Sequence, residues 1–288
     1  MRHLLALILT LLATGALGAC GADGEPEPGA GEQALLRRGH EGMEHVHGLG
    51  VRGGTLFLAT HDGMWIARDG ERKARRHGAS RQDVMGFAIL DDGRFIGSGH
   101  PELRQDLPPH LGLIESRDEG ERWRSVSLLG EADFHVLEAA GSRVYGFDGV
   151  KGRFMASADG GRRWARRSSA PGSMFDLAID PRSAERAVAA TDRGLFTTAD
   201  GGRGWRRLRG GVTGLVAWPS AKRLFLVSAG GDVAVSEDAG RRWRIVGDVN
   251  GQPVAFAADG ADLYVAVADG TVLRSPDGGR SWTVRIAP

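Results

Sequence analysis

The octapeptide Ser157-Ala-Asp-Gly-Gly-Arg-Arg-Trp164 decides the fold, because the chain repeats its pattern at regular intervals. The pattern S/T-x-D-x-G-x-x-W occurs five times, at steps of 38 to 41 residues. The copies begin at Ser116, Ser157, Thr198, Ser236 and Ser275. An earlier, decayed copy keeps Asp69 but lacks the hydroxyl and the tryptophan. A fixed period of this length indicates a repeat protein built from one supersecondary unit.

Each residue type in the octapeptide has a structural use in a tight turn. A hydroxyl and a carboxylate two positions apart can hydrogen-bond the backbone of a hairpin, and glycine supplies a positive φ. The tryptophan begins the next strand and can bury its ring between neighbouring sheets. We therefore interpret the repeated residues as structural. They are Ser116, Asp118, Gly120 and Trp123; Ser157, Asp159, Gly161 and Trp164; Thr198, Asp200, Gly202 and Trp205; Ser236, Asp238, Gly240 and Trp243; and Ser275, Asp277, Gly279 and Trp282.

Between the octapeptides the chain alternates short apolar runs with turn residues. Residues 173–209 illustrate this with SMFDLAID, ERAVAATD, GLFTTAD and WRRLR. Four short strands in about forty residues are typical of one blade of a β-propeller. The sequence thus predicts an all-β, six-bladed propeller over residues 45–288, with blades beginning near residues 45, 83, 132, 173, 212 and 252. The alternative is seven blades, if residues 33–44 or the insert around 98–112 complete another one.

The octapeptides resemble the Asp-box, or BNR, repeat of sialidases, sortilin-type receptors and related bacterial propellers. The order of HVHGLG (45–50), THDG (60–63), QDVMGF (82–87), SGHPELRQDLPP (98–109), GLIES (112–116) and LLGEADFH (128–135) is similar to a family of exported bacterial lipoproteins catalogued as glycosyl hydrolase-like. The resemblance implies a sialidase-like propeller whose ligand site lies on the face opposite the octapeptide turns. Fold alone does not choose between an enzyme and a binding protein, since propellers support both.

The first 44 residues have a different composition from the rest. A basic start and the apolar run from Leu4 to Leu17 are typical of a signal peptide, here residues 1–19. The run ends in Leu-Gly-Ala-Cys20, which resembles a bacterial lipobox, and Cys20 is the single cysteine. We expect Cys20 to carry lipid and residues 20–44, rich in Gly, Pro and Glu, to form a flexible tether. The predicted location is the outer face of the cytoplasmic membrane or cell envelope, with the membrane as a partner through the anchor.

The charge balance is nearly neutral. Lys and Arg number 37 and Asp and Glu 36, which leaves a net charge of +1. A propeller with so small a net charge has no overall field that would attract nucleic acid, so no nucleic-acid partner is expected.

Polar residues outside the repeat concentrate on one predicted face. The starts of the first strands and the turns between second and third strands should share the face opposite the octapeptides, and most of the histidines lie at such positions in blades one to three. We predict a ligand site there that includes His45, His47, His61, His100, Arg104, His135 and Asp176.

Three functions compete for this site. A glycoside hydrolase would need two carboxylates, for which the candidates are Asp62, Asp83, Glu102 and Asp133. The Arg-Ile-Pro type motif that sialidases carry near the first blade is absent, so sialidase activity itself is not expected. A non-catalytic module would bind a glycan or protein, with the insert from Ser98 to His110, stiffened by prolines, as its specificity loop.

The third function is metal binding. Residues i and i+2 of a strand share a face, which would let His45 and His47 chelate one ion. A third imidazole from His61, His100 or His135 would suit Zn(II) or Cu(II). The cofactor expectation is therefore open between no ion and one of these metals.

Overall fold

The computed structural model describes residues 43, 45–167 and 170–288. The predicted signal peptide, the lipidation site Cys20 and the tether, apart from Met43, lie outside these residues. All regular structure in the described part is β-strand, and no helix there is long and apolar enough to cross a membrane.

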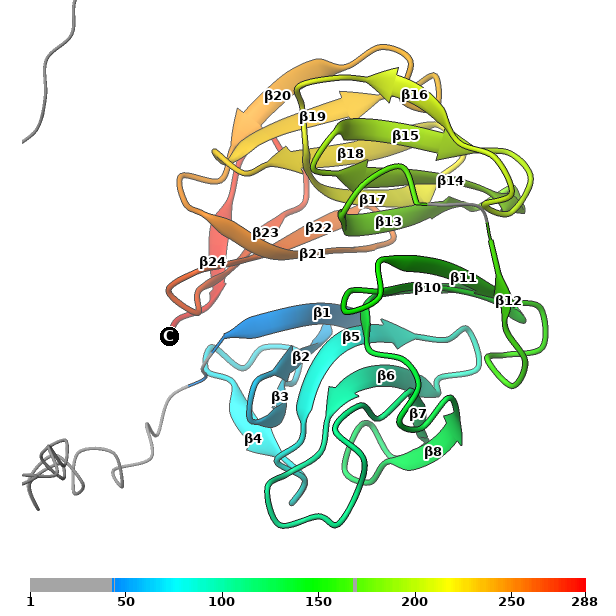
Figure 1. The fold of residues 1–288 in the computed structure, drawn as a ribbon. Coiled ribbons are helices and arrows are strands. Elements are labelled where there is room, and N and C mark those ends of the chain that lie inside the picture. Colours follow the sequence, from blue (N-terminus) through cyan, green and yellow to red (C-terminus); the bar gives the residue numbers. More distant parts are fainter. Residues whose placement is uncertain (1–42, 44, 168–169) are drawn as a thin grey trace, which may run out of the picture. The chain divides into compact units, whose positions relative to one another are not determined.

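The strands form six four-stranded antiparallel sheets, each made of four consecutive strands (Figure 1). Blade 1 comprises β1 (Val46–Arg52), β2 (Thr55–Thr60), β3 (Gly63–Ala67) and β4 (Arg75–His77). Blade 2 comprises β5 (Asp83–Ile89), β6 (Phe95–His100), β7 (Leu113–Ser116) and β8 (Arg124–Ser127). Blade 3 comprises β9 (Phe134–Ala140), β10 (Arg143–Asp148), β11 (Arg153–Ser157) and β12 (Ala165–Arg166).

The second half of the chain repeats the plan. Blade 4 comprises β13 (Met174–Asp180), β14 (Ser183–Thr191), β15 (Gly194–Thr198) and β16 (Arg206–Arg209). Blade 5 comprises β17 (Gly214–Ser220), β18 (Arg223–Ser228), β19 (Asp232–Ser236) and β20 (Arg244–Asp248). Blade 6 comprises β21 (Pro253–Asp259), β22 (Asp262–Val267), β23 (Val272–Ser275) and β24 (Thr283–Ile286). The predicted six-bladed propeller is confirmed, and the insert around 98–112 joins β6 to β7 without forming a further blade.

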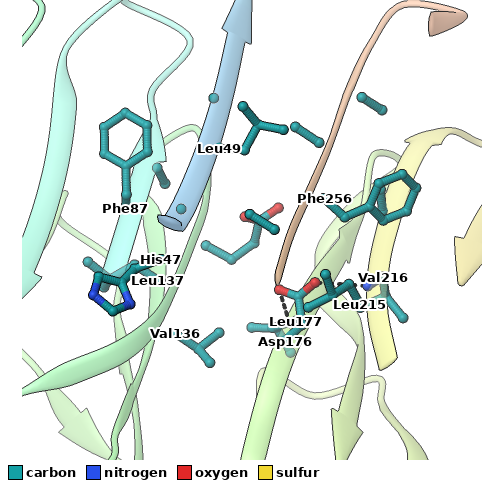
Figure 2. A pocket seen from close by; sticks show the side chains of 18 of the residues that line it. His47, Leu49, Phe87, Val136, Leu137, Asp176, Leu177, Leu215, Val216 and Phe256 are labelled. Atoms are coloured by element: carbon teal, nitrogen blue, oxygen red, sulfur yellow. Dashed lines mark hydrogen bonds between the residues drawn. The ribbon is translucent and has the colours of Figure 1, made fainter. Parts of the chain in front are cut away.

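The blades form a ring through their first strands. Each of β1, β5, β9, β13, β17 and β21 contacts the next in this order, and β21 contacts β1. The six first strands thus surround a central channel, lined by apolar side chains such as Leu49, Phe87 and Phe256 (Figure 2). The hydrophobic core is divided among the six blade-to-blade seams, as at the seam of blades 1 and 2, where Phe57 and Met64 pack with Val84 and Phe95.

The octapeptides form the turns between the third and fourth strands of blades 2 to 6. In every copy the hydroxyl donates to the aspartate Oδ1 at 2.8–3.0 Å and accepts from the backbone N–H of the pattern glycine at 2.8–2.9 Å. That glycine has φ between +80° and +92°. The tryptophans pack at the seam with the preceding blade, as Trp164 of blade 3 does: its Nε1–H donates to Ser127 Oγ of blade 2 at 3.0 Å, and its ring packs in the core of that seam.

The ring closes without a shared strand. Blade 6 is entirely C-terminal, and Val46, Leu56 and Trp65 of blade 1 pack with Tyr264 and Ile286 of blade 6. Outside this core, Ala287 pairs with Lys73, and Arg285 donates to the carbonyl oxygens of Gly54 and Arg68. Side-chain packing and a few edge hydrogen bonds therefore hold the seam where the two ends of the propeller meet.

Candidate metal centre

A bulge near the start of the first strand directs one side chain of most blades toward the channel. In blades 1, 2, 3, 4 and 6 the pairing of first and second strands skips one residue. An unpaired bulge residue re-aims its side chain relative to the alternation of the strand. The skipped residues are His47, Met85, His135, Phe175 and Val254, and all five line the channel. His47 and His135 thus hold equivalent positions in two blades, with Met85 between them.

The first cluster of polar side chains joins blade 1 to blade 2. It consists of His47 on the bulge of β1, His61 in the turn between β2 and β3, and Asp83 at the start of β5. His61 Nδ1 lies 3.0 Å from Asp83 Oδ2, and His47 Nε2 lies 3.4 Å from Asp83 Oδ1. Asp83 is buried, with 9% of its surface exposed. The cluster therefore brings one carboxylate and two imidazoles together at the mouth of the channel.

Two buried atoms of the first cluster make no hydrogen bond. They are His47 Nε2 and Asp83 Oδ1, which face each other. A buried polar atom without a partner costs free energy, about 1–3 kcal/mol and more if charged. A cation bound between these two atoms would satisfy both.

The second cluster joins blade 2 to blade 3 and is centred on Asp133. His135 Nε2 lies 2.9 Å from Asp133 Oδ2, and His100 Nε2 lies 3.5 Å from the same oxygen. The His110 ring stacks at an angle beside His100, with centroids 5.8 Å apart. Asp133 is 1% exposed. Among the described residues, His100, His110 and Asp133 form one group, and His47, His61 and Asp83 the other, in which the ligand atoms lie within 4.8 Å of one another.

The electrostatics of the second cluster favour an ionised carboxylate. Burial acts to raise the pKa of Asp133, but the hydrogen bond from His135 and the charges of His135, His100 and His110 lower it overall. In turn, the hydrogen bond to Asp133 raises the pKa of His135. Asp133 is therefore a carboxylate at neutral pH, the form that binds a cation.

The structure does not place His45 in a ligand group with His47. His45 precedes β1 with a φ of +41° and is exposed, and the bulge after Val46 breaks the alternation that would place both imidazoles on one face. The rings of His45 and His61 are 6.3 Å apart, and His45 is in neither ligand group. It borders the mouth of the channel beside the first cluster.

The remaining predicted site residues divide into two sets. Asp62 forms ion pairs with Arg76 and Arg81, and Glu102 accepts a hydrogen bond from the backbone of Arg81. Arg104 is exposed on the insert. Asp62, Glu102 and Arg104 are therefore not in either ligand group, whereas the candidate carboxylates Asp83 and Asp133 are at their centres.

Asp176 lies in the channel and not in a ligand group. Figure 2 shows it on the other side of the channel from His47. Its oxygens accept from the backbone N–H groups of Leu177 and Val216, the latter across a blade seam. Glu138 lines the same channel, and burial together with the charge of Asp176 raises its pKa to about 8.

Met85 and Glu138, which line the channel, were not predicted from the sequence as site residues, whereas His110 was expected on this face as part of the insert but was not named as a ligand. His110 reaches the second cluster through the path of the insert, which no local pattern specifies. In the sequence Met85 and Glu138 have the pattern of ordinary strand residues. Their place in the channel follows from the bulge in β5 and from the arrangement of the first strands in a ring.

Comparisons with known proteins support the fold. No protein-family model matches the chain, and no curated protein is significantly similar to it. Solved structures are similar. YCF48 bound to a D1 peptide has 18% identity and a TM-score of 0.51, over 84% of this chain and 82% of that one. The GH74 xyloglucanase of Xanthomonas campestris has 17% identity and a TM-score of 0.58, over 85% of this chain and 45% of that one.

A third similar structure is a nidogen/laminin complex, with 14% identity and a TM-score of 0.60 over 76% of this chain and 88% of that one. The shared feature is the propeller. At these identities the likeness establishes the fold and carries no residue of an active site to this chain.

Proposed function

We propose that this chain is an exported, lipid-anchored propeller of the Asp-box type that binds a transition-metal ion, zinc or copper, at the mouth of its channel. The anchor is Cys20, and the octapeptide turns lie on the face away from the site. The observation that carries the proposal is a pair of buried atoms without a hydrogen bond, His47 Nε2 and Asp83 Oδ1, which face each other 3.4 Å apart.

The donor set fits a metal of this class. Two imidazoles and one carboxylate are ligands of zinc sites that keep an open position, and imidazole also suits copper. The ligands of the first cluster come from three separate segments, β1, the β2–β3 turn and β5, and each segment is part of a hydrogen-bonded sheet. Such a framework holds the ligands near their bound geometry, which reduces the entropic cost of binding.

Glycoside hydrolysis has less support from the geometry. A pair of catalytic carboxylates must face one substrate bond, whereas Asp83 and Asp133 are each surrounded by histidines of separate clusters. Tyrosine cannot replace them as the nucleophile, because Tyr145 and Tyr264 are buried in the seams and Tyr145 donates to the carbonyl of Ala184.

Calorimetric titration of the full chain with Zn(II) and with Cu(II) tests the metal proposal. The chain should carry Cys20→Ser, so that the thiol does not bind metal. We expect the double variant His47→Ala, His61→Ala to lose the affinity of the first cluster at least about 100-fold, since a site with one ligand left binds weakly.

The matched control is His45→Ala, an exposed imidazole beside the same cluster. We expect its affinity to equal that of the parent. The proposal fails if the double variant binds both metals as the parent does, or if His45→Ala weakens binding as much as the double variant.

A protein ligand is the second candidate function. Leu103 and Leu107 are exposed on the insert beside the second cluster, at 106% and 44% of their reference surface. Among the similar structures, YCF48 is bound to a peptide and nidogen is in a complex with laminin. A photo-cross-linking residue at position 103 in cells should capture one discrete partner, whereas the same residue at Ile245, exposed on blade 5, should not. Equal capture at both positions would remove this candidate.

A further inference from the structure

We infer that the chain holds a second zinc site, formed by His100, His110 and Asp133, and that zinc there fastens the insert between β6 and β7 to blade 3. This inference goes beyond the proposed function, because it uses other ligands at another seam and can hold or fail without it. The ligands come from both sides of the seam: His100 ends β6, His110 lies in the insert, and Asp133 precedes β9.

The second site repeats the plan of the first. Asp83 and Asp133 stand at the start of the first strand of consecutive blades. Each faces histidines of the preceding blade that lie at the end of the second strand or in the connection after it, His61 for Asp83, and His100 with His110 for Asp133. Two equivalent seams therefore carry the same donor set, one carboxylate and two imidazoles.

The hydrogen bond of His100 determines which of its nitrogens is free. Its Nδ1 lies 2.8 Å from the carbonyl oxygen of Pro109. A carbonyl can only accept, so Nδ1 carries the proton and donates. In a neutral imidazole Nε2 then presents a lone pair, and this atom faces the carboxylate oxygen of Asp133 at 3.5 Å. In that neutral form the lone pair and the carboxylate repel, and either a proton on Nε2 or a metal cation between the two atoms removes the repulsion. Metal-bound histidines commonly donate their other N–H to a backbone carbonyl in this way.

Two further buried atoms of this group have no hydrogen-bond partner. Asp133 is 1% exposed, and its Oδ1 makes no hydrogen bond. His110 Nδ1 is also buried without a partner. A buried carboxylate oxygen and a buried imidazole nitrogen both cost free energy when left unpaired, and a bound metal would satisfy both.

His135 completes the site without being a ligand in the group. Its Nε2 donates to Asp133 Oδ2 at 2.9 Å, and this hydrogen bond fixes the orientation of the carboxylate. Carboxylate ligands of metals are held by such hydrogen bonds. His135 is thus a positioning residue. Two nitrogens and one carboxylate oxygen suit tetrahedral Zn(II) with one open position.

The metal would control the insert. Within the insert the hydrogen bonds include Leu111 N–H to Gly99 and Gln105 N–H to Glu102. Its tip, residues 103–109, is exposed. The end of the insert is already tied to the segment before β9, because Gly130 N–H donates to the carbonyl of His110 and Gly112 N–H to that of Ala132. A zinc ion that ligates His110 and Asp133 would add a side-chain tie at the same place. Zinc should therefore decrease the opening of the loop and its cleavage by proteases, which need a locally unfolded segment.

The stoichiometry of zinc tests the second site. The full chain with Cys20→Ser should bind two equivalents in calorimetry. The variant without His47 and His61 should bind one equivalent, at the second site. The variants His110→Gln and Asp133→Asn should also bind one equivalent, at the first cluster. The inference is wrong if the parent binds one equivalent that only the His47 and His61 variant abolishes, or if His110→Gln still binds two. If the parent binds a single equivalent of zinc and His110→Gln abolishes it, the second site is supported. The proposed function, which needs the site of His47, His61 and Asp83, then fails.

Limited trypsin digestion at the exposed Arg104 tests the effect on the loop and does not depend on metal counting. Zinc should slow cleavage of the parent at least about tenfold, a free-energy difference of about 1.4 kcal/mol. It should leave the cleavage rate of His110→Gln unchanged. The control Glu102→Gln changes the same loop outside the ligand group and should respond to zinc as the parent does. Equal protection of the parent and His110→Gln by zinc would refute the proposal that zinc fastens the insert to blade 3, provided that both proteins melt at similar temperatures without metal.

Discussion

At the scale of single residues, the carboxyl groups of the channel differ from ordinary surface acids. Burial raises the pKa of Asp176 to about 7, although its two backbone hydrogen bonds oppose this, and burial with the charge of Asp176 raises that of Glu138 to about 8. Both acids bind protons more tightly in the folded chain than in the unfolded one. Each therefore lowers the stability of the fold as the pH rises from about 4 through these values.

We expect the variant Glu138→Gln to lose less folding stability than the parent as the pH rises. Between the unfolded and folded pKa of Glu138, the folded state holds one proton more, so stability falls with rising pH and the full penalty applies above pH 8. At pH 9 the variant should melt at least about 2–4 °C above the parent, and at pH 4 the two should be similar. Glu237→Gln, on an exposed turn of blade 5, is the control and should change neither melting temperature. A parent whose melting temperature is the same at both pH values would contradict the prediction.

The residues of the candidate site could be predicted from the sequence only in part. The concentration of His47, His61, His100 and His135 on one face could be predicted, because repeat positions identify the face. The pairing of His45 with His47 could not, since it assumed regular alternation and the first strand contains a bulge. A bulge depends on how two strands meet at the channel, and nothing in HVHGLG alone specifies it.

At the scale of elements, the octapeptide turn combines backbone geometry with packing. Gly160 and Gly161 are neighbours with φ of +73° and +85°. A Cβ on Gly160 would meet only the end of an arginine at 3.8 Å, whereas one on Gly161 would lie 2.0 Å from Cδ2 of Leu113, which is fully buried in the seam. The second glycine thus serves the contact between blades as well as the turn.

Alanine at these two glycines should separate the two effects. Gly160→Ala should cost about 1–2 kcal/mol of unfolding free energy, the price of a positive φ for a residue with a Cβ. Gly161→Ala should cost about 1–3 kcal/mol more, because its methyl group overpacks the seam. Urea unfolding of the two variants measures the difference. Equal losses would show that the seam yields to the extra carbon at no cost.

The elements themselves could be predicted well. The blade starts expected from the repeat fall within two residues of β1, β5, β9, β13, β17 and β21. This works because the octapeptide marks a fixed point in five of the six blades and the strands are short. The insert was harder, since its prolines predict stiffness but not the path that brings His110 beside His100.

At the scale of the whole molecule, one seam differs from the other five. It joins blade 6 to blade 1, where no chain connection passes from one blade to the next and blade 1 lacks the octapeptide tryptophan. Trp65 of β3 packs in the core of this seam, and the guanidinium of Arg76 lies 4.9 Å from the centre of its ring. Ring closure could not be predicted from the sequence, because it depends on contacts between residues more than 200 positions apart.

Arg285→Ala should weaken this seam. Its guanidinium is largely buried and donates to the carbonyl oxygens of Gly54, Arg68 and Glu71 in blade 1. Loss of these charged hydrogen bonds should cost about 2 kcal/mol, which corresponds to about 4–8 °C in melting temperature. Arg244→Ala, on an exposed strand of blade 5, is the control. Equal melting temperatures for the two variants would mean that core packing alone closes the ring.

The closure without a shared strand has a consequence for the order of the blades along the chain. Met43 and Pro288 both lie within 4 Å of where a Cβ on Gly270 would stand, so the two ends of the propeller are neighbours. A short linker between them, with a new opening in the loop of residues 210–213 between β16 and β17, would give a circular permutant. Each blade would keep its own four strands, and all six seams would keep their side chains. The ring can therefore begin at any blade.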